Sequence, residues 1–172
     1  MGKYGDVERM NEKQFQDAFC QRLKGAGWHV EREISDVTNN NRLDVVAYHP
    51  IFDAWFCFEL KIPNSIKDYT KCLRQMIRYH DAKFKYPTDF LCLLTPKNDF
   101  SLSFMVVERF FWRWGFGVGN FESMKVQFVN GEAIATVNLL HPESYYFTPK
   151  KQITEIKRRT SNAWSGKNDD ES

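Results

Sequence analysis

Trp55-Phe56-Cys57-Phe58-Glu59-Leu60-Lys61-Ile62 is the stretch on which the fold and the chemistry of this chain depend. It is apolar except for Glu59 and Lys61, and Pro63 follows it. Side chains alternate across a strand, so an extended segment here places Glu59 and Lys61 on one face; the other face is filled by Phe56, Phe58, Leu60 and Ile62. The stretch therefore predicts a strand over 55–62 that is buried on one face and charged on the other.

The elements around this strand are predicted from hydrophobic periodicity and from turn residues. We expect helices over 10–24, 66–82 and 104–114, and strands over 28–34, 42–49, 89–95, 124–129 and 132–140. Asn130-Gly131 between the last two strands is a strong hairpin signal. The order α-β-β-β-α-β, followed by α-β-β, predicts an α/β domain with a central mixed sheet flanked by helices, plus a C-terminal helix and β-hairpin.

Length and composition predict a single domain over 1–149 and a basic, then acidic, partly disordered tail over 150–172. The net charge of +2 argues against binding to nucleic acid by bulk charge alone. No two cysteines form a CxxC pair, so zinc and iron–sulfur sites are not expected. There is no nucleophile elbow and no phosphate-binding glycine loop. Met1 leads directly into polar residues and no apolar run could span a membrane, which predicts a cytoplasmic protein with free thiols.

A carboxylate in the preceding strand faces the charged positions. Asp44 interrupts the apolar strand over 42–49 in the same way that Glu59 interrupts the next one. If His49 lies opposite Ala54, Asp44 falls directly opposite Glu59, with Cβ atoms about 4.5–5.5 Å apart. Two carboxylates this close repel each other unless a cation lies between them. The pair therefore predicts a site for Mg²⁺ or Mn²⁺, with the Leu60 carbonyl as a third ligand.

Lys61 adds a cation one step along the same face of the strand. Its ammonium can orient a water molecule or stabilise the charge that builds on a phosphoryl oxygen. A metal ion and a lysine together meet the needs of phosphodiester hydrolysis. Two surface ion pairs are the plain alternative, but an Asp and a Glu-x-Lys on adjacent strands favour the catalytic interpretation.

Asp44, followed after fourteen residues by Glu59-Leu60-Lys61, resembles the D…(D/E)xK signature of the PD-(D/E)XK nuclease superfamily. The resemblance covers about residues 10–96 and implies a restriction-endonuclease-like α-β-β-β-α-β core. Leu43 stands where the motif has its proline, a position that is loose in this superfamily.

The following helix sharpens the resemblance, because Gln75-Met76-Ile77-Arg78-Tyr79 reads as the QxxxY motif of RecB-type nucleases. Gln75 and Tyr79 are neighbours on one helical face, with Lys71 and Arg78 beside them. This implies that the four side chains position a nucleic-acid backbone near the metal. An ordinary helix surface with a packed tyrosine is the alternative.

The resemblance also implies a further acid from the first helix, for which Glu12 is the best candidate. Glu31 and Glu33 are its rivals on the neighbouring strand. The aromatic run over 110–114 is expected in the core or at the surface of a homodimer.

These features together predict a RecB-like, Mg²⁺- or Mn²⁺-dependent nuclease with DNA favoured over RNA as substrate. A structure-specific endonuclease of the Holliday-junction resolvase or VRR type is the alternative with the same chemistry. A non-catalytic nucleic-acid-binding module of the same fold is the alternative from a different class.

Overall fold

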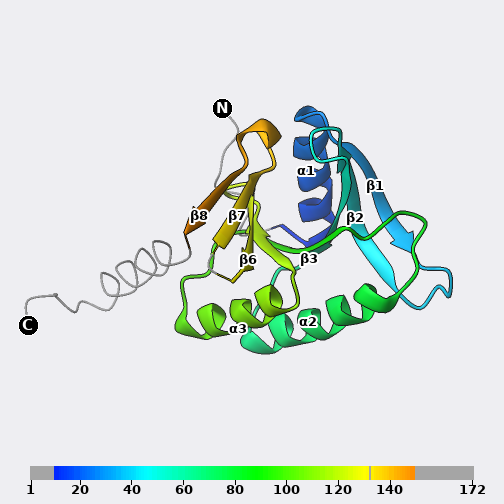
Figure 1. Ribbon diagram of the computed structural model, residues 1–172. Helices are drawn as coiled ribbons and strands as arrows, with labels where there is room; N and C mark the ends of the chain where they lie inside the picture. The colour runs from blue at the N-terminus through cyan, green and yellow to red at the C-terminus, as the bar shows by residue number, and fades with distance from the viewer. Residues whose placement is uncertain (1–9, 132, 150–172) are drawn as a thin grey trace, which may run out of the picture.

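The computed structural model describes residues 10–131 and 133–149. Within these residues, eight strands form one mixed sheet whose spatial order follows the chain (Figure 1). One helix lies on one face of the sheet, and two helices lie together on the other. The expected α/β architecture, a central mixed sheet flanked by helices, is confirmed. The tail over 150–172, with the basic cluster Lys157-Arg158-Arg159, lies outside the described residues.

The helices are α1 (Glu12–Gly25), α2 (Ile66–Asp81) and α3 (Leu102–Arg113). The strands are β1 (His29–Ser35), β2 (Arg42–His49), β3 (Ala54–Leu60), β4 (Phe90–Thr95), β5 (Gly117–Asn120), β6 (Lys125–Asn130), β7 (Ala133–Asn138) and β8 (Tyr146–Pro149), with a 3-10 helix η2 (Pro142–Ser144) before β8. Strands β3, β4 and β5 pair in parallel, and all other neighbours are antiparallel. Parallel neighbours need crossover connections, which α2 and α3 provide.

Helix α1 begins at Glu12, and Asn11 caps its N-terminus. The Asn11 side chain accepts a hydrogen bond from the Gln14 amide at 2.9 Å, and the Gln14 side chain accepts one from the Asn11 amide at 3.0 Å. This capping box satisfies two amides that the first turn leaves unpaired. The apolar stripe that includes Phe15 and Phe19 is fully buried, and Phe19 meets Phe58 of β3 edge to face. The α1 face of the sheet is therefore a closed apolar core.

The opposite face packs against α2 and α3 through a second core that includes Cys57, Met76 and Leu93. All four cysteines are buried and free, as expected. None of the described helices combines the length and apolarity needed to cross a membrane.

The strand that follows α3 is not predicted from the sequence. Gly115, Gly117 and Gly119 suggest a break, yet Gly117 and Gly119 belong to strand β5. A Cβ on Gly117 would stand 2.6 Å from Val126 Cγ1, and one on Gly119 would stand 2.4 Å from the Lys125 carbonyl oxygen. The glycines permit close approach of β6 rather than ending an element.

The β6–β7 hairpin is confirmed, with its connection one residue later than expected. Asn130 pairs with Ala133, so Gly131, with φ +58°, begins the connection. Strand β8 is an element that the sequence analysis missed. The aromatic run over 110–114 is divided between core and surface: Phe111 is buried, whereas Phe110 and Trp114 are about half exposed.

Candidate active site

Strands β2 and β3 pair in the register that the sequence predicts, with His49 opposite Ala54. The ladder extends to Val45 opposite Phe58, so Asp44 and Glu59 come next on the two strands. The Leu60 amide faces β2 here and donates a 2.8 Å hydrogen bond to Asp44 Oδ2. The Asp44 side chain thus accepts the hydrogen bond of a β3 amide at the point where the backbone ladder between β2 and β3 ends.

Glu59 is a buried carboxyl group with only 7% of the residue exposed. Burial and the neighbouring charge of Asp44 raise its pKa from 4.5 to about 8. Asp44 and Glu59 follow the last ladder pair on neighbouring strands, and like charges at such positions raise one another's pKa. Strongly perturbed carboxyl pairs of this kind are concentrated at functional sites.

Asp44 is half-buried, and its backbone is held by α1 as well as by the sheet. Burial raises the pKa of its carboxyl group, while the Leu60 amide acts in the opposite direction. The Gln16 side-chain amide donates a 2.8 Å hydrogen bond to the Asp44 carbonyl. Gln16 was not among the residues predicted from the sequence, although it lies one turn after Glu12 on the same helical face.

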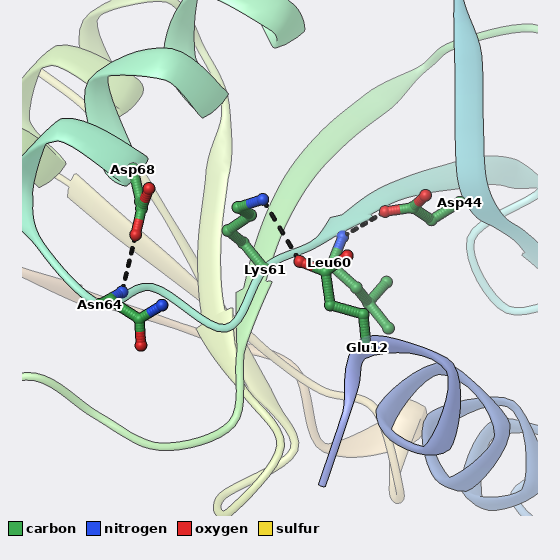
Figure 2. A network of polar contacts seen from close by, with 6 residues as sticks. All are labelled: Glu12, Asp44, Leu60, Lys61, Asn64 and Asp68. Carbon is green, nitrogen blue, oxygen red and sulfur yellow. Dashed lines mark hydrogen bonds and ion pairs between the residues drawn. The ribbon is translucent and has the colours of Figure 1, made fainter.

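Lys61 contacts Glu12, the acid expected from the first helix. Figure 2 shows the Lys61 ammonium directed at the Glu12 carboxylate, with Nζ and Oε1 3.3 Å apart. Burial lowers the pKa of Lys61, but the hydrogen bond and charge of Glu12 and the charge of Asp68 outweigh it, so the pKa is raised. Asp68 also accepts the Asn64 amide at 2.7 Å where the chain enters α2. Lys61 is therefore a cation at neutral pH.

The rival acids on β1 do not contact Lys61. Glu33 is exposed, with φ +52°, and its charge contributes to the raised pKa of Asp44. The charge of Glu31 acts on Lys85 instead. Glu12 is thus the one of the three acids that contacts Lys61.

Tyr79 of α2 points inward and joins the same site. Only 1% of this residue is exposed, and its hydroxyl group lies 2.7 Å from the Arg42 carbonyl and 3.2 Å from Glu59 Oε2. The Gln75 side-chain amide donates to the same hydroxyl group. A hydroxyl group has one proton, so Tyr79 donates to one of the two oxygens at a time, and donation to Glu59 stabilises the ionised carboxylate.

A polar pocket of about 390 Å³ opens beside Asp44, between α2 and the loop that joins β1 to β2. Its lining residues are Ser35, Asn39, Asn40, Asn41, Arg42, Asp44, Gln75, Arg78 and Tyr79. Arg78 is therefore brought to the site together with Gln75 and Tyr79. Lys71 is exposed on α2 and does not line this pocket. The run Asn39-Asn40-Asn41-Arg42 directly before Leu43 was the signal for this wall that the sequence analysis missed.

A second pocket of about 750 Å³ lies at the carboxyl ends of β3 and β4. It is lined by residues 62–64, Tyr69 and residues 95–101. None of the expected site residues lines it, so the smaller polar pocket is the one that belongs to the site.

The donor set suits a hard divalent ion that retains water. Among the described residues, no group of three or more His, Cys, Asp and Glu side chains is placed to hold a metal ion. Mg²⁺, however, is usually bound by one or two carboxylates, with water and substrate phosphate completing its shell. Asp44, half-buried, and Glu59, buried, provide two carboxyl groups whose raised pKa values a cation would reverse. The residues present therefore fit such an ion.

A scan of protein-family models and searches of curated proteins and of solved structures find no match to this chain.

Proposed function

We propose that this chain is a metal-dependent nuclease of the PD-(D/E)XK type that hydrolyses phosphodiester bonds. The observation that carries the proposal is the group formed by Asp44, Glu59 and Lys61. The half-buried Asp44 and the buried Glu59 carry carboxyl groups with raised pKa values, beside a protonated lysine that contacts Glu12. Such a group destabilises the fold unless a cation and an anionic substrate complete it.

The order and arrangement of the elements support a restriction-endonuclease-like core. From α1 to β4 the chain follows α-β-β-β-α-β, with an antiparallel β1-β2-β3 meander and β4 parallel to β3. Asp44 and Glu59 lie where β2 and β3 cease to pair, and residues 61–65 lead from β3 into α2. This is the arrangement that the sequence resemblance implies for residues 10–96.

The proposed roles follow from the contacts. Asp44 and Glu59 would hold Mg²⁺ or Mn²⁺, with the Leu60 carbonyl as the expected third ligand. When bound, such an ion lowers the pKa of water and offsets charge on the scissile phosphate. Lys61 is protonated, so it orients the attacking water and stabilises a phosphoryl oxygen as a hydrogen-bond donor, and it does not act as a base. Glu12 fixes the direction of the Lys61 ammonium.

The contact between Tyr79 and Glu59 supports the RecB-like assignment. Tyr79 of the QxxxY motif reaches Glu59, and Gln75 donates to the Tyr79 hydroxyl group. The motif therefore connects α2 directly to the carboxylates, and a packed surface tyrosine does not describe it.

DNA is the proposed substrate, in preference to RNA. A structure-specific endonuclease, such as a Holliday-junction resolvase or a VRR-type enzyme, would use the same residues and differ in the substrate it cuts. A non-catalytic module would bind nucleic acid without metal-dependent cleavage. The half-exposed Phe110 and Trp114 leave a homodimer as a prediction.

The test is a digestion panel of single-stranded DNA, duplex DNA, four-way junctions and RNA, each with Mg²⁺, Mn²⁺ or EDTA. Wild-type protein should cleave at least one DNA substrate with metal and none with EDTA. Lys61→Met should abolish this cleavage and retain nucleic-acid binding, because binding depends mostly on cations along the backbone path. Lys67→Met is the matched control, because Lys67 is an exposed lysine on α2 that lines neither pocket. Absence of metal-dependent cleavage across the whole panel would contradict the proposal.

A further inference from the structure

The polar pocket beside Asp44 is a built cavity with a distinct chemical character. All nine of its lining residues have polar side chains, and they come from β1, the β1–β2 loop, β2 and α2. Its volume of about 390 Å³ lies within the usual range for small-ligand pockets of about 300–1,000 Å³. A cavity without apolar walls favours a charged or strongly hydrated ligand over a stacked aromatic ring.

Two arginines that form no ion pair within the described residues line this pocket. Within residues 10–131 and 133–149, the Arg42 and Arg78 side chains take part in none of the ion pairs or hydrogen bonds. The charge of Arg42 also lowers the pKa of Asp44, so its guanidinium group acts on the site itself. Two planar guanidinium groups with all their donors available are suited to a phosphate group, which they can bind in bidentate fashion.

The β1–β2 loop lines one side of the pocket, and Asp36 holds this loop in one conformation. Asp36 is buried, with 5% of the residue exposed, and accepts hydrogen bonds from the Thr38 hydroxyl group and from both the backbone and the side chain of Asn41. It also accepts the Asn40 amide at 3.0 Å. Asn39 adopts φ +58°, a conformation that asparagine tolerates better than most residues.

Because of these contacts, the loop is preorganised. The Val37 amide donates to the Lys83 carbonyl at 2.9 Å and so ties the loop to the segment after α2. The exposed Asn39 and Asn40 side chains then reach the pocket without loss of further loop entropy.

We propose that this pocket is a backbone subsite that binds the phosphodiester adjacent to the scissile one. The inference rests on the proposed nuclease function and extends it to the path of the substrate strand. Arg42 and Arg78 bind the flanking phosphate, and the Asn39 and Asn40 amides bind the attached sugar or base edge. Asp36 is a positioning residue that acts through the loop and does not contact the substrate.

The test combines arginine variants with substrates that carry one neutral methylphosphonate linkage, moved stepwise along the strand. Affinity is measured by fluorescence anisotropy in EDTA, so that it is independent of cleavage. For wild-type protein, a methylphosphonate at one position next to the cut should weaken binding about tenfold. Arg42→Gln and Arg78→Gln should each weaken binding to the unmodified strand by a similar factor and should no longer respond to that linkage. Each should also reduce the slope of log affinity against log salt by about 1.

Arg74→Gln is the matched control, since Arg74 is exposed one turn before Arg78 and does not line the pocket. It should retain both the response to methylphosphonate and the salt slope. The subsite is overturned if the Arg42 and Arg78 variants behave like the Arg74 variant, or if no oligonucleotide binds. If cleavage is intact but the Arg42 and Arg78 variants still respond to the methylphosphonate linkage, the subsite is wrong and the nuclease proposal stands. If these variants lose the response but the wild-type protein shows no metal-dependent cleavage, the subsite stands and the nuclease proposal is wrong.

Asp36→Ala tests the loop separately. It should raise KM about tenfold with kcat within threefold, because it disorganises the pocket wall and leaves the carboxylates in place. Asp53→Ala is its control. Asp53 lies in the connection between β2 and β3, where it accepts a hydrogen bond from the Tyr48 hydroxyl group, and it does not line the pocket. A roughly tenfold loss of kcat with an unchanged KM in Asp36→Ala would contradict a positioning role.

Discussion

The two faces of strand β3 differ in what they contribute. On the α1 face, Phe56 and Phe58 are buried among apolar side chains. On the α2 face, Cys57 is followed by buried Glu59 and then by Lys61. Burial of apolar side chains on the α1 face stabilises the fold, whereas poorly solvated carboxyl groups on the α2 face destabilise it.

This difference separates stability from function within one strand. Replacing residues on the α1 face should destabilise the protein without altering the chemistry of the folded molecules. Replacing polar residues on the α2 face should alter chemistry and leave the fold intact or more stable, as is common for active sites.

The largest expected effect is on catalysis. Asp44→Asn should reduce kcat on the order of 10⁴-fold, equivalent to about 5.5 kcal/mol of activation free energy. The amide retains the acceptor for the Leu60 N–H but loses the charge that would hold a metal ion. Single-turnover cleavage measures the rate, and circular dichroism checks the fold. Asp81→Asn, at the exposed C-terminal end of α2, should retain wild-type kcat. Near-wild-type cleavage by the Asp44 variant would mean that the chemistry resides elsewhere.

Phe58→Ala should destabilise the protein by about 3–5 kcal/mol, because a fully buried aromatic side chain leaves a cavity. Denaturant unfolding measures the loss. The kcat per folded molecule should remain within a few-fold of wild type, since Phe58 faces α1. A loss of kcat as large as that of Asp44→Asn would remove the distinction between the faces.

Mg²⁺ should stabilise the protein through the α2 face alone. At a free concentration 100 times its Kd, an ion that binds only the folded state adds about 2.7 kcal/mol. Thermal unfolding with and without Mg²⁺ measures this gain. It should disappear in Asp44→Asn and remain in any folded variant of the α1 face, for example Phe19→Leu. A gain retained by Asp44→Asn would place the ion at another site.

Glu59→Gln should make the metal-free protein more stable at alkaline pH. The folded-state pKa of about 8 exceeds the ordinary 4.5, so between these values the folded protein binds a proton that the unfolded chain has released. Stability of the wild type therefore falls as pH rises from about 4.5 to 8, and the variant lacks this decline. We expect a gain of about 1–3 kcal/mol at pH 8 and little difference at pH 4.

Urea unfolding across this pH range in EDTA measures the effect. Glu122→Gln, which removes an exposed carboxylate, is the control and should follow the wild-type profile. A Glu59 variant with the wild-type slope would show that this carboxyl group is ionised in the folded protein.

The sequence by itself determined the central part of the fold and of the candidate site. Alternation placed Glu59 opposite the apolar face of its strand, and the short turn after His49 predicted the register that brings Asp44 beside it. Both rest on local rules: side chains alternate with period two, and turn length sets the register. The i, i+4 spacing of Gln75 and Tyr79 was equally local, and the two side chains are in contact.

Only the tertiary structure decided the contacts between distant segments. Glu12 meets Lys61 across 49 positions of sequence; the sequence favoured Glu12, but it left Glu31 and Glu33 as rivals. The glycines of β5 read as a break because their close approach to β6 is a packing requirement, which no local pattern reveals. Arg42 and Arg78 share a pocket because α2 crosses the sheet beside the β1–β2 loop. Side chains from separate elements converge according to how helices pack on a twisted sheet, and that packing depends on the whole core.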